Sequence, residues 1–312
     1  MLLLIAEIVA GWAMLAFAAD HLLVGSGRLA ERLGLQPAVV GTLVIGCVAG
    51  APEVIVVATS GLRGHGELAA AALVGANLVN VTLVLGVGGL MGGLAVRSRL
   101  LQREALLSVA AVTVFAILLL HGLGLGASVT LAAALAGALA LLHHLARSAP
   151  GDEVAIQATR YLRTDAPQHP GREVRRTLLG LAGVLSGAQL LVMGASGFSA
   201  WTGASADLAA FTLVAFGLAL PDLLFTLRAQ RYGGGDLVIA TLLGANLITS
   251  LAGGAIAAFT SRQAPTLAPT LIIAMVAVSG TTWLLLAPGT PLGRPQSAIL
   301  VMAYALLLLL SI

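Results

Sequence analysis

Two carboxylates stand directly after prolines inside apolar stretches of this sequence. They belong to the segments Pro52-Glu53 and Pro221-Asp222, and they lie 169 residues apart. A charged side chain at the centre of a membrane helix costs roughly 2.5–3.5 kcal/mol, so an intramembrane acid indicates a functional site. Two such acids facing each other predict a cation site, and we single out Glu53 and Asp222 as its anchors.

A second pair of segments follows these acids at one shared spacing. Each reads Gly-Ala-Asn, and the two end at Asn77 and Asn246. Because the acids and the amides recur together at a constant spacing, we infer an internal duplication. Whatever chemistry the chain performs, both halves are expected to contribute to it.

The composition places these residues in a membrane protein. Of the 312 residues 59% are apolar and 9% are charged, and the mean hydropathy is +1.02. Apolar runs of about 18 residues or more can cross a bilayer as helices, and lipid cannot satisfy an open backbone in any other way short of a closed barrel. We therefore predict an all-α integral membrane protein with ten transmembrane helices. Their approximate spans are 2–25, 36–60, 68–92, 101–122, 124–146, 177–201, 206–228, 236–260, 266–287 and 295–312.

Arginine alone sets the expected orientation, since the chain contains no lysine. The loops of odd number hold fourteen of the sixteen arginines, and the loops of even number hold only Arg63 and Arg262. The positive-inside rule then places the odd loops in the cytoplasm and both termini outside, in what we expect to be a prokaryotic plasma (inner) membrane. The basic balance is explained by this topology, so no nucleic-acid partner is predicted.

The hydrophilic stretch 147–176 divides the chain into two halves of five spans each, 1–146 and 177–312. Five is an odd number, so two halves of one fold must lie upside down relative to each other. Many secondary transporters are such inverted repeats, with broken helices around a site at the membrane midplane. Proline removes a helical N–H, so Pro52 and Pro221 are expected to break their helices and brace the site.

The two segments around these acids resemble the cation/calcium exchanger superfamily, most closely prokaryotic sodium/calcium exchangers. Those proteins carry a Gly-Thr-Ser-x-Pro-Glu segment and a Gly-Ser-Asn segment in each of two inverted repeats. The resemblance implies alternating access by a secondary-active antiporter that is not an enzyme and needs no cofactor. Its calcium ligands would fall here on Glu53, Asp222, Asn80, Thr249 and the backbone carbonyls of Ala49 and Leu218. The resemblance also assigns Asn77 and Asn246 to the pathway or to helix bracing.

The chain also departs from the family pattern. Four serine positions that help to bind sodium in the family are occupied here by Gly50, Ala76, Ala219 and Ala245. Sodium needs several oxygens, so their loss argues against sodium coupling more than against a divalent site. Ca²⁺ prefers six to eight oxygens, which carboxylates, carbonyls and waters can supply. Two apposed acids without a cation are not both expected to stay ionised, which makes protons an alternative counter-ion.

Two other classes of protein remain open at this point. A membrane scaffold or regulatory subunit could have kept the fold and lost transport, consistent with the missing hydroxyls. An intramembrane aspartyl protease also uses two acids, but its Tyr-Asp segment is absent. Asp20, beside His21, could serve a proton relay, and we favour an interfacial role because it lies near the end of its span. Oligomeric state is not predicted.

Overall fold

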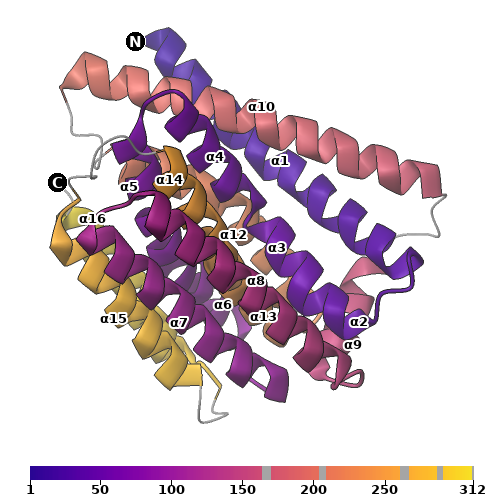
Figure 1. Ribbon diagram of the computed structural model, residues 1–312. Coiled ribbons are helices and arrows are strands. Elements are labelled where there is room, and N and C mark those ends of the chain that lie inside the picture. Colours follow the sequence, from indigo (N-terminus) through magenta and orange to yellow (C-terminus); the bar gives the residue numbers. More distant parts are fainter. Residues whose placement is uncertain (164–169, 204–208, 261–266, 287–290, 311–312) are drawn as a thin grey trace.

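The chain folds as a bundle of helices around a buried centre (Figure 1). The computed structural model describes residues 1–163, 170–203, 209–260, 267–286 and 291–310, and within these ranges the only β-pairing is an isolated bridge between Leu94 and Leu292. The first half contains α1 (Leu2–Arg32), α2 (Pro37–Val39), η1 (Val40–Val44), α3 (Ile45–Ala49), α4 (Ala51–Leu62), α5 (Gly66–Val79), η2 (Asn80–Val84), α6 (Leu85–Gly92), α7 (Arg99–His121) and α8 (Leu125–Arg147). After α9 (Glu153–Leu162) follow α10 (Pro170–Thr202), η3 (Ala210–Val214), α12 (Ala215–Arg231), α13 (Gly235–Ile248), η4 (Thr249–Gly253), α14 (Gly254–Thr260), α15 (Pro269–Leu286) and α16 (Arg294–Leu310).

These elements confirm an all-helical membrane protein. Within the described ranges nine helices, some built from consecutive elements, are long and apolar enough to cross a membrane. The tenth expected span corresponds to α16, an apolar helix of 17 residues that is shorter than the others. The expected span limits at 206, 266, 287 and 312, and Arg262, lie outside the described residues.

Two composite helices form the centre of the bundle. In each of the helices Gly66–Gly92 and Gly235–Thr260, 94% of the most apolar 18-residue segment is buried inside the protein. In the corresponding segment of α1 the buried share is 28%. Each of these helices belongs to one half of the chain, and each carries one Gly-Ala-Asn segment. Polar side chains on them are therefore enclosed by protein rather than exposed to lipid.

The long helices α1 and α10 lie side by side along one flank of the bundle (Figure 1). Their backbones approach closely at small residues, since a Cβ added to Gly180 would lie 2.4 Å from the backbone nitrogen of Leu22. Such approach is how membrane helices gain packing energy in the absence of a hydrophobic driving force between them. The pair forms a continuous wall beside the centre.

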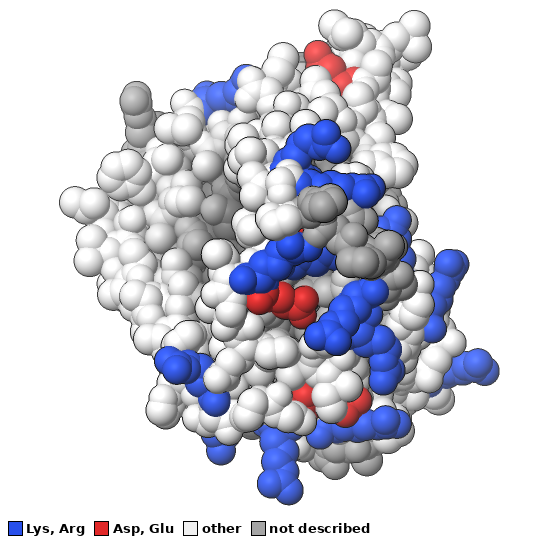
Figure 2. All heavy atoms as spheres, turned by 90° about the vertical axis from the view of Figure 1, so that its right-hand side faces the viewer, with Lys and Arg blue, Asp and Glu red and all other residues white. Residues whose placement is uncertain are grey.

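The loops of odd number meet at one end of the bundle. The Asp236 side chain, just after the α12–α13 turn, accepts backbone hydrogen bonds from Arg97 (2.8 Å) and Ser98 (2.9 Å), which precede α7. Gln157 of α9 donates to the same carboxylate at 3.1 Å. Figure 2 shows arginine side chains gathered on the face where α1 ends and α10 begins. The arginine-rich segments thus share one end.

The stretch between the halves is more structured than a linker. Its helix α9 buries Val154, Ala158 and Tyr161, and a Cβ on Gly41 would lie 2.9 Å from the Val154 side chain. Helix α10 already begins at Pro170, before the expected start of span six at 177. Helix α9 therefore packs against the first half at Gly41 and contacts the second half through Gln157.

Candidate functional site

Glu53 lies at a helix break in the first half. The chain leaves α3 at Gly50 and begins α4 at Ala51, so Glu53 stands in the first turn of α4. Free N–H groups and the helix dipole favour an anion there. The side chain is 1% exposed, accepts a hydrogen bond from its own backbone N–H, and leaves Oε2 without a partner.

Asp222 occupies the matching position in the second half, but its helix is not broken. Helix α12 runs from Ala215 to Arg231 with Pro221 inside it, which corrects the expectation of a break in each half. Asp222 is 3% exposed, and its Oδ2 has no partner. The negative charge of Asp222 repels a negative charge on Glu53. The fold therefore brings the two expected carboxylates close together in a buried place, each with a free oxygen.

The amides of the two halves meet in a hydrogen-bonded network. Asn80 Nδ2 donates to Asn246 Oδ1 at 3.0 Å, and Asn246 Nδ2 donates to the carbonyl of Asn77 at 3.2 Å. Ser250 Oγ donates to Asn77 Oδ1 at 3.1 Å. All four residues are at most 1% exposed. This network joins α5 and η2 of the first half to α13 and η4 of the second half.

A π-helical turn begins at each of the two expected neutral ligands. Asn80 is the first residue of η2, and Thr249 is the first residue of η4. π-turns inside α-helices occur frequently at functional sites because they shift side chains and loosen backbone pairing. The Thr249 hydroxyl is fully buried without a partner, so it keeps a free oxygen. No residue pattern in the sequence marks these turns.

The expected backbone ligands, the carbonyls of Ala49 and Leu218, each lie four residues before one of the two acids in sequence. Because proline has no N–H, Pro52 leaves the carbonyl of Val48 without its helical donor, and Pro221 does the same for Gly217. These residues directly precede the expected ligands Ala49 and Leu218, which are both buried. A cavity of about 10 Å³ touches Ala49 and Asp222, enough for a single water molecule. Carbonyl oxygens are thus available beside the acids.

The four positions that lack the family serines are enclosed. Ala76, Ala219 and Ala245 are at most 2% exposed, and Gly50 is buried as well. A Cβ on Gly50 would lie 3.1 Å from the Ile248 side chain and 3.2 Å from the carbonyl of Ala245. These positions therefore present no hydroxyl to a cation, and Gly50 has little room for one.

Asp20 pairs with arginines at the end of the bundle where the odd loops meet. It contacts Arg228 and, at 3.5 Å, Arg176, and its side chain is 18% exposed. The arrangement fits the interfacial role. Asp20 also lines the small cavity that reaches Asp222, so the pair lies between that end and the acids.

One buried acid escaped the sequence analysis. Glu104 of α7 is 0% exposed, and neither of its carboxylate oxygens has a hydrogen-bond partner. The signal available in the sequence was an acid within the predicted span 101–122, and the absence of a repeat partner kept it from notice. Glu104 lies outside the pair formed by Glu53 and Asp222.

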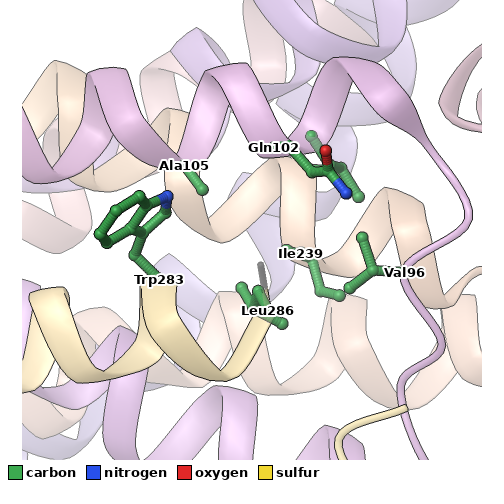
Figure 3. Close-up of a pocket in the computed structure, with 7 residues that line it drawn as sticks. Val96, Gln102, Ala105, Ile239, Trp283 and Leu286 are labelled. Atoms are coloured by element: carbon green, nitrogen blue, oxygen red, sulfur yellow. The ribbon is translucent and has the colours of Figure 1, made fainter. Parts of the chain in front are cut away.

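Other parts of the described chain offer poorer cation chemistry. The described residues contain no group of three or more His, Cys, Asp or Glu side chains that could hold a metal ion. A pocket between α7, α13 and α15 is lined mainly by apolar side chains, among them Ile239, Trp283 and Leu286, with Gln102 at its edge (Figure 3).

The chain is similar to known proteins over most of its length. A family model described as sodium/calcium exchanger protein matches residues 3–143 and 176–312. A protein of Alkalimonas amylolytica with the name "Putative antiporter CaxA" is 30% identical over 255 residues that cover 78% of this chain and 77% of that protein. The inner membrane protein YrbG of Escherichia coli K12 is 27% identical over 250 residues, or 79% of this chain and 77% of that protein.

A solved structure of the sodium-calcium exchanger NCX_Mj, soaked with Na⁺ and Sr²⁺, matches with a TM-score of 0.71 at 22% identity, covering 98% of this chain and 97% of that one. This likeness shows a shared fold. The family model covers most of both halves, and the relatives cover most of the chain. The chain therefore belongs to the sodium/calcium exchanger protein family.

Proposed function

We propose that this chain is a secondary-active cation antiporter that binds Ca²⁺ between Glu53 and Asp222 and carries it across the membrane by alternating access. The observation that carries the proposal is the pair of buried carboxylates, one from each half, that lie close together with a free oxygen each. Such a pair is costly without a cation or a proton between the acids. A divalent cation neutralises both charges at once.

The remaining ligands are neutral oxygens. Ca²⁺ takes six to eight of them at roughly 2.3–2.6 Å. The buried hydroxyl of Thr249 and the side chain of Asn80 supply two candidates, and the carbonyls of Ala49 and Leu218 supply two more. Pro52 and Pro221 free the carbonyls next to these, while Asn77 and Asn246 brace the two repeats.

The architecture proposed is that of two inverted repeats of five helices. Residues 1–146 form the first repeat, 177–312 the second, and 147–176 the cytoplasmic connection that contains α9. The common end of the odd-numbered loops and their arginines support this orientation, with both termini outside the cell. Alternating access then follows from movement of one repeat against the other around the fixed site.

Protons are the counter-ion that this site favours over sodium. The four positions that would supply hydroxyls for flanking Na⁺ sites carry no hydroxyl, and Na⁺ needs several oxygens. When the divalent cation leaves, the two carboxylates repel each other at close range, and uptake of a proton by one of them relieves that repulsion. The protein would then exchange Ca²⁺ for H⁺.

The test is Ca²⁺ flux into liposomes that contain the purified protein, driven in turn by a proton gradient and by a sodium gradient. We expect proton-driven flux that Glu53→Gln reduces by about 100-fold, because it removes one of the two negative charges that would hold the cation. The matched control is Glu67→Gln, which changes an exposed acid in the first turn of α5. Its flux should equal that of the unsubstituted chain.

Each other outcome has a definite meaning. Sodium-driven flux would show that backbone and water replace the lost hydroxyls and would overturn the counter-ion assignment. Flux that survives Glu53→Gln would overturn the site. No flux under either gradient, with no saturable cation binding, would favour a non-transporting scaffold that keeps the exchanger fold.

A further inference from the structure

Glu104 is a buried acid that the proposed cation site does not use. It lies in the second turn of α7, is 0% exposed, and has no hydrogen-bond partner at either carboxylate oxygen. An isolated ionised carboxylate in an apolar interior is so costly that the group takes up a proton instead. In this conformation Glu104 is therefore a neutral carboxylic acid.

The carboxyl group lies where two site-bearing elements touch. The helices α3 and α13 cross at Gly46 and Gly244, where a Cβ on Gly244 would lie 2.8 Å from the Cα of Gly46. The same Cβ position lies 3.5 Å from Oε1 of Glu104. Helix α3 leads into the break before Glu53, and α13 carries Asn246. The protonation state of Glu104 can therefore affect how α3 and α13 pack, and these two elements position site residues of both halves.

Asp152, an acid outside the proposed cation site, acts electrostatically on Glu104. Asp152 is partly exposed, and its charge reaches Glu104. Its Oδ2 accepts a hydrogen bond from the backbone N–H of Leu100 at 3.4 Å, one turn before Glu104, while its Oδ1 caps α9 through Val154 at 3.0 Å. Asp152 therefore bridges the start of α7, which carries Glu104, and the start of α9 at the end of the bundle where the odd-numbered loops meet.

The other titratable groups on the surrounding helices leave Glu104 without a counter-ion. Helix α15 and the turn η4 carry no titratable side chain, and α13 carries only Asp236, which is held by the segment before α7. The remaining titratable side chains on α3, α7 and α8 are Cys47, Arg99, Arg103, His121, His143, His144 and Arg147. Arg103, the nearest of the arginines in sequence, is exposed.

We propose that Glu104 is a proton-binding site and that Glu104 must be protonated for α3 and α13 to close on each other. The proton reaches Glu104 from the end of the bundle that carries Asp152. When the crossing opens, water reaches the carboxylic acid, which releases its proton to water and becomes a carboxylate. Closure requires that a proton bind again. The proton thereby regulates the movement around the cation site, and this inference rests on the proposed function.

The first experiment measures equilibrium exchange of radiolabelled Ca²⁺ across liposomes with equal Ca²⁺ and equal pH on both sides. No ion gradient drives this exchange, so it reports the movement rather than the counter-ion. We expect the rate of the unsubstituted protein to fall at alkaline pH, approaching about tenfold per pH unit for one proton. Glu104→Gln stays neutral at every pH, so it should keep its rate and lose the alkaline fall.

A second variant tests the path to water. Asp152→Asn removes the nearby charge but keeps a good N-cap for α9. Without that charge Glu104 loses its proton more readily, so the alkaline fall should begin at lower pH. Glu67→Gln, on the exposed start of α5, should follow the unsubstituted profile.

A third measurement does not depend on transport. Thermal unfolding in detergent should show that the unsubstituted protein loses stability as pH rises, because the folded state holds a proton that the unfolded chain releases. Glu104→Gln should lose the part of this decline that Glu104 contributes, so its stability should fall less steeply as pH rises. A role in packing alone would instead shift the stability of Glu104→Gln equally at every pH.

The outcomes separate this inference from the proposed function. No Ca²⁺ exchange by the unsubstituted protein at any pH would remove the proposed function, and the regulation with it. Exchange without an alkaline fall, or a fall that Glu104→Gln retains, would overturn the proton site and leave the antiporter intact. A Glu104→Gln variant that is folded but inactive at every pH would also overturn it.

Discussion

The side-chain amide of Asn80 donates a hydrogen bond to the side-chain oxygen of Asn246 across 3.0 Å, and this bond joins the two halves of the chain at their buried centre. Asn246 in turn donates a hydrogen bond from its side-chain amide to the backbone carbonyl of Asn77. Polar side chains hold membrane helices together through such bonds. Here the bond also orients Asn80, an expected ligand of the cation.

Replacing the central amide should therefore weaken the fold. Asn246→Ala leaves the amide of Asn80 and the carbonyl of Asn77 buried without these partners, so we expect a loss of about 1–3 kcal/mol in the free energy of unfolding. Unfolding in detergent measures it. Thr281→Ala is the control, since it removes an exposed hydroxyl that bonds only within its own helix. Equal stabilities of the two variants would contradict the bracing role.

Restoring hydroxyls should change the ion specificity. A chain with Ala76→Ser, Ala219→Ser and Ala245→Ser keeps every Cβ in place and adds a hydroxyl at three of the four family serine positions. We expect this variant to gain sodium-driven Ca²⁺ flux that the unsubstituted protein lacks, because Na⁺ needs several oxygens. Flux under a sodium gradient in liposomes measures it. An unchanged dependence on sodium would show that the hydroxyls do not decide the counter-ion.

Serine at the fourth position should behave differently. A side chain on Gly50 would crowd Ile248 and the carbonyl of Ala245 at 3.1–3.2 Å. Overpacking a tight interior costs about 1–3 kcal/mol. Gly50→Ser should therefore lower the unfolding temperature in detergent, while Ala219→Ser, which already has its Cβ, should lower it less. A Gly50→Ser variant as stable as the unsubstituted chain would show that the neighbours yield.

The crossing of α3 and α13 should not tolerate a methyl group. Gly46→Ala would place a Cβ 3.0 Å from the Cα of Gly244, so the backbones must separate. We expect a loss of about 1–3 kcal/mol in unfolding free energy and slower Ca²⁺ exchange. Gly137→Ala on α8 is the matched control, because its Cβ would meet nothing within 4 Å. That substitution should be neutral or slightly stabilising.

Two ion pairs that join α1 to other helices should differ in strength. Arg28 and Glu173 are buried, 3.3 Å apart, and Arg28 also donates to the carbonyl of Leu162. Arg28→Gln strands a buried acid and should cost about 3–5 kcal/mol. The side chain of Arg228 is 51% exposed in its pair with Asp20, so Arg228→Gln should cost about 1 kcal/mol or less. Unfolding in detergent compares them, and equal losses would contradict the dependence on burial.

Much of the fold and half of the site could be predicted from residue types and spacing. Lipid forces the backbone into helices, so apolar runs alone predict the spans, and an acid inside such a run is conspicuous because it is costly. The repetition of Glu53 by Asp222, and of Asn77 by Asn246, predicts which residues share a site. These features are local, which is why the order of residues reveals them.

The contacts between the halves were decided by tertiary packing. The pattern predicted a break at Pro221, yet α12 continues through it, because neighbouring helices can compensate a missing hydrogen bond inside a bundle. The pairing of Asn80 with Asn246 and the π-turns at Asn80 and Thr249 depend on how two distant helices meet. Glu104 has no repeat partner to mark it, and only its enclosure beside Gly244 shows that its buried carboxyl lacks a hydrogen-bond partner.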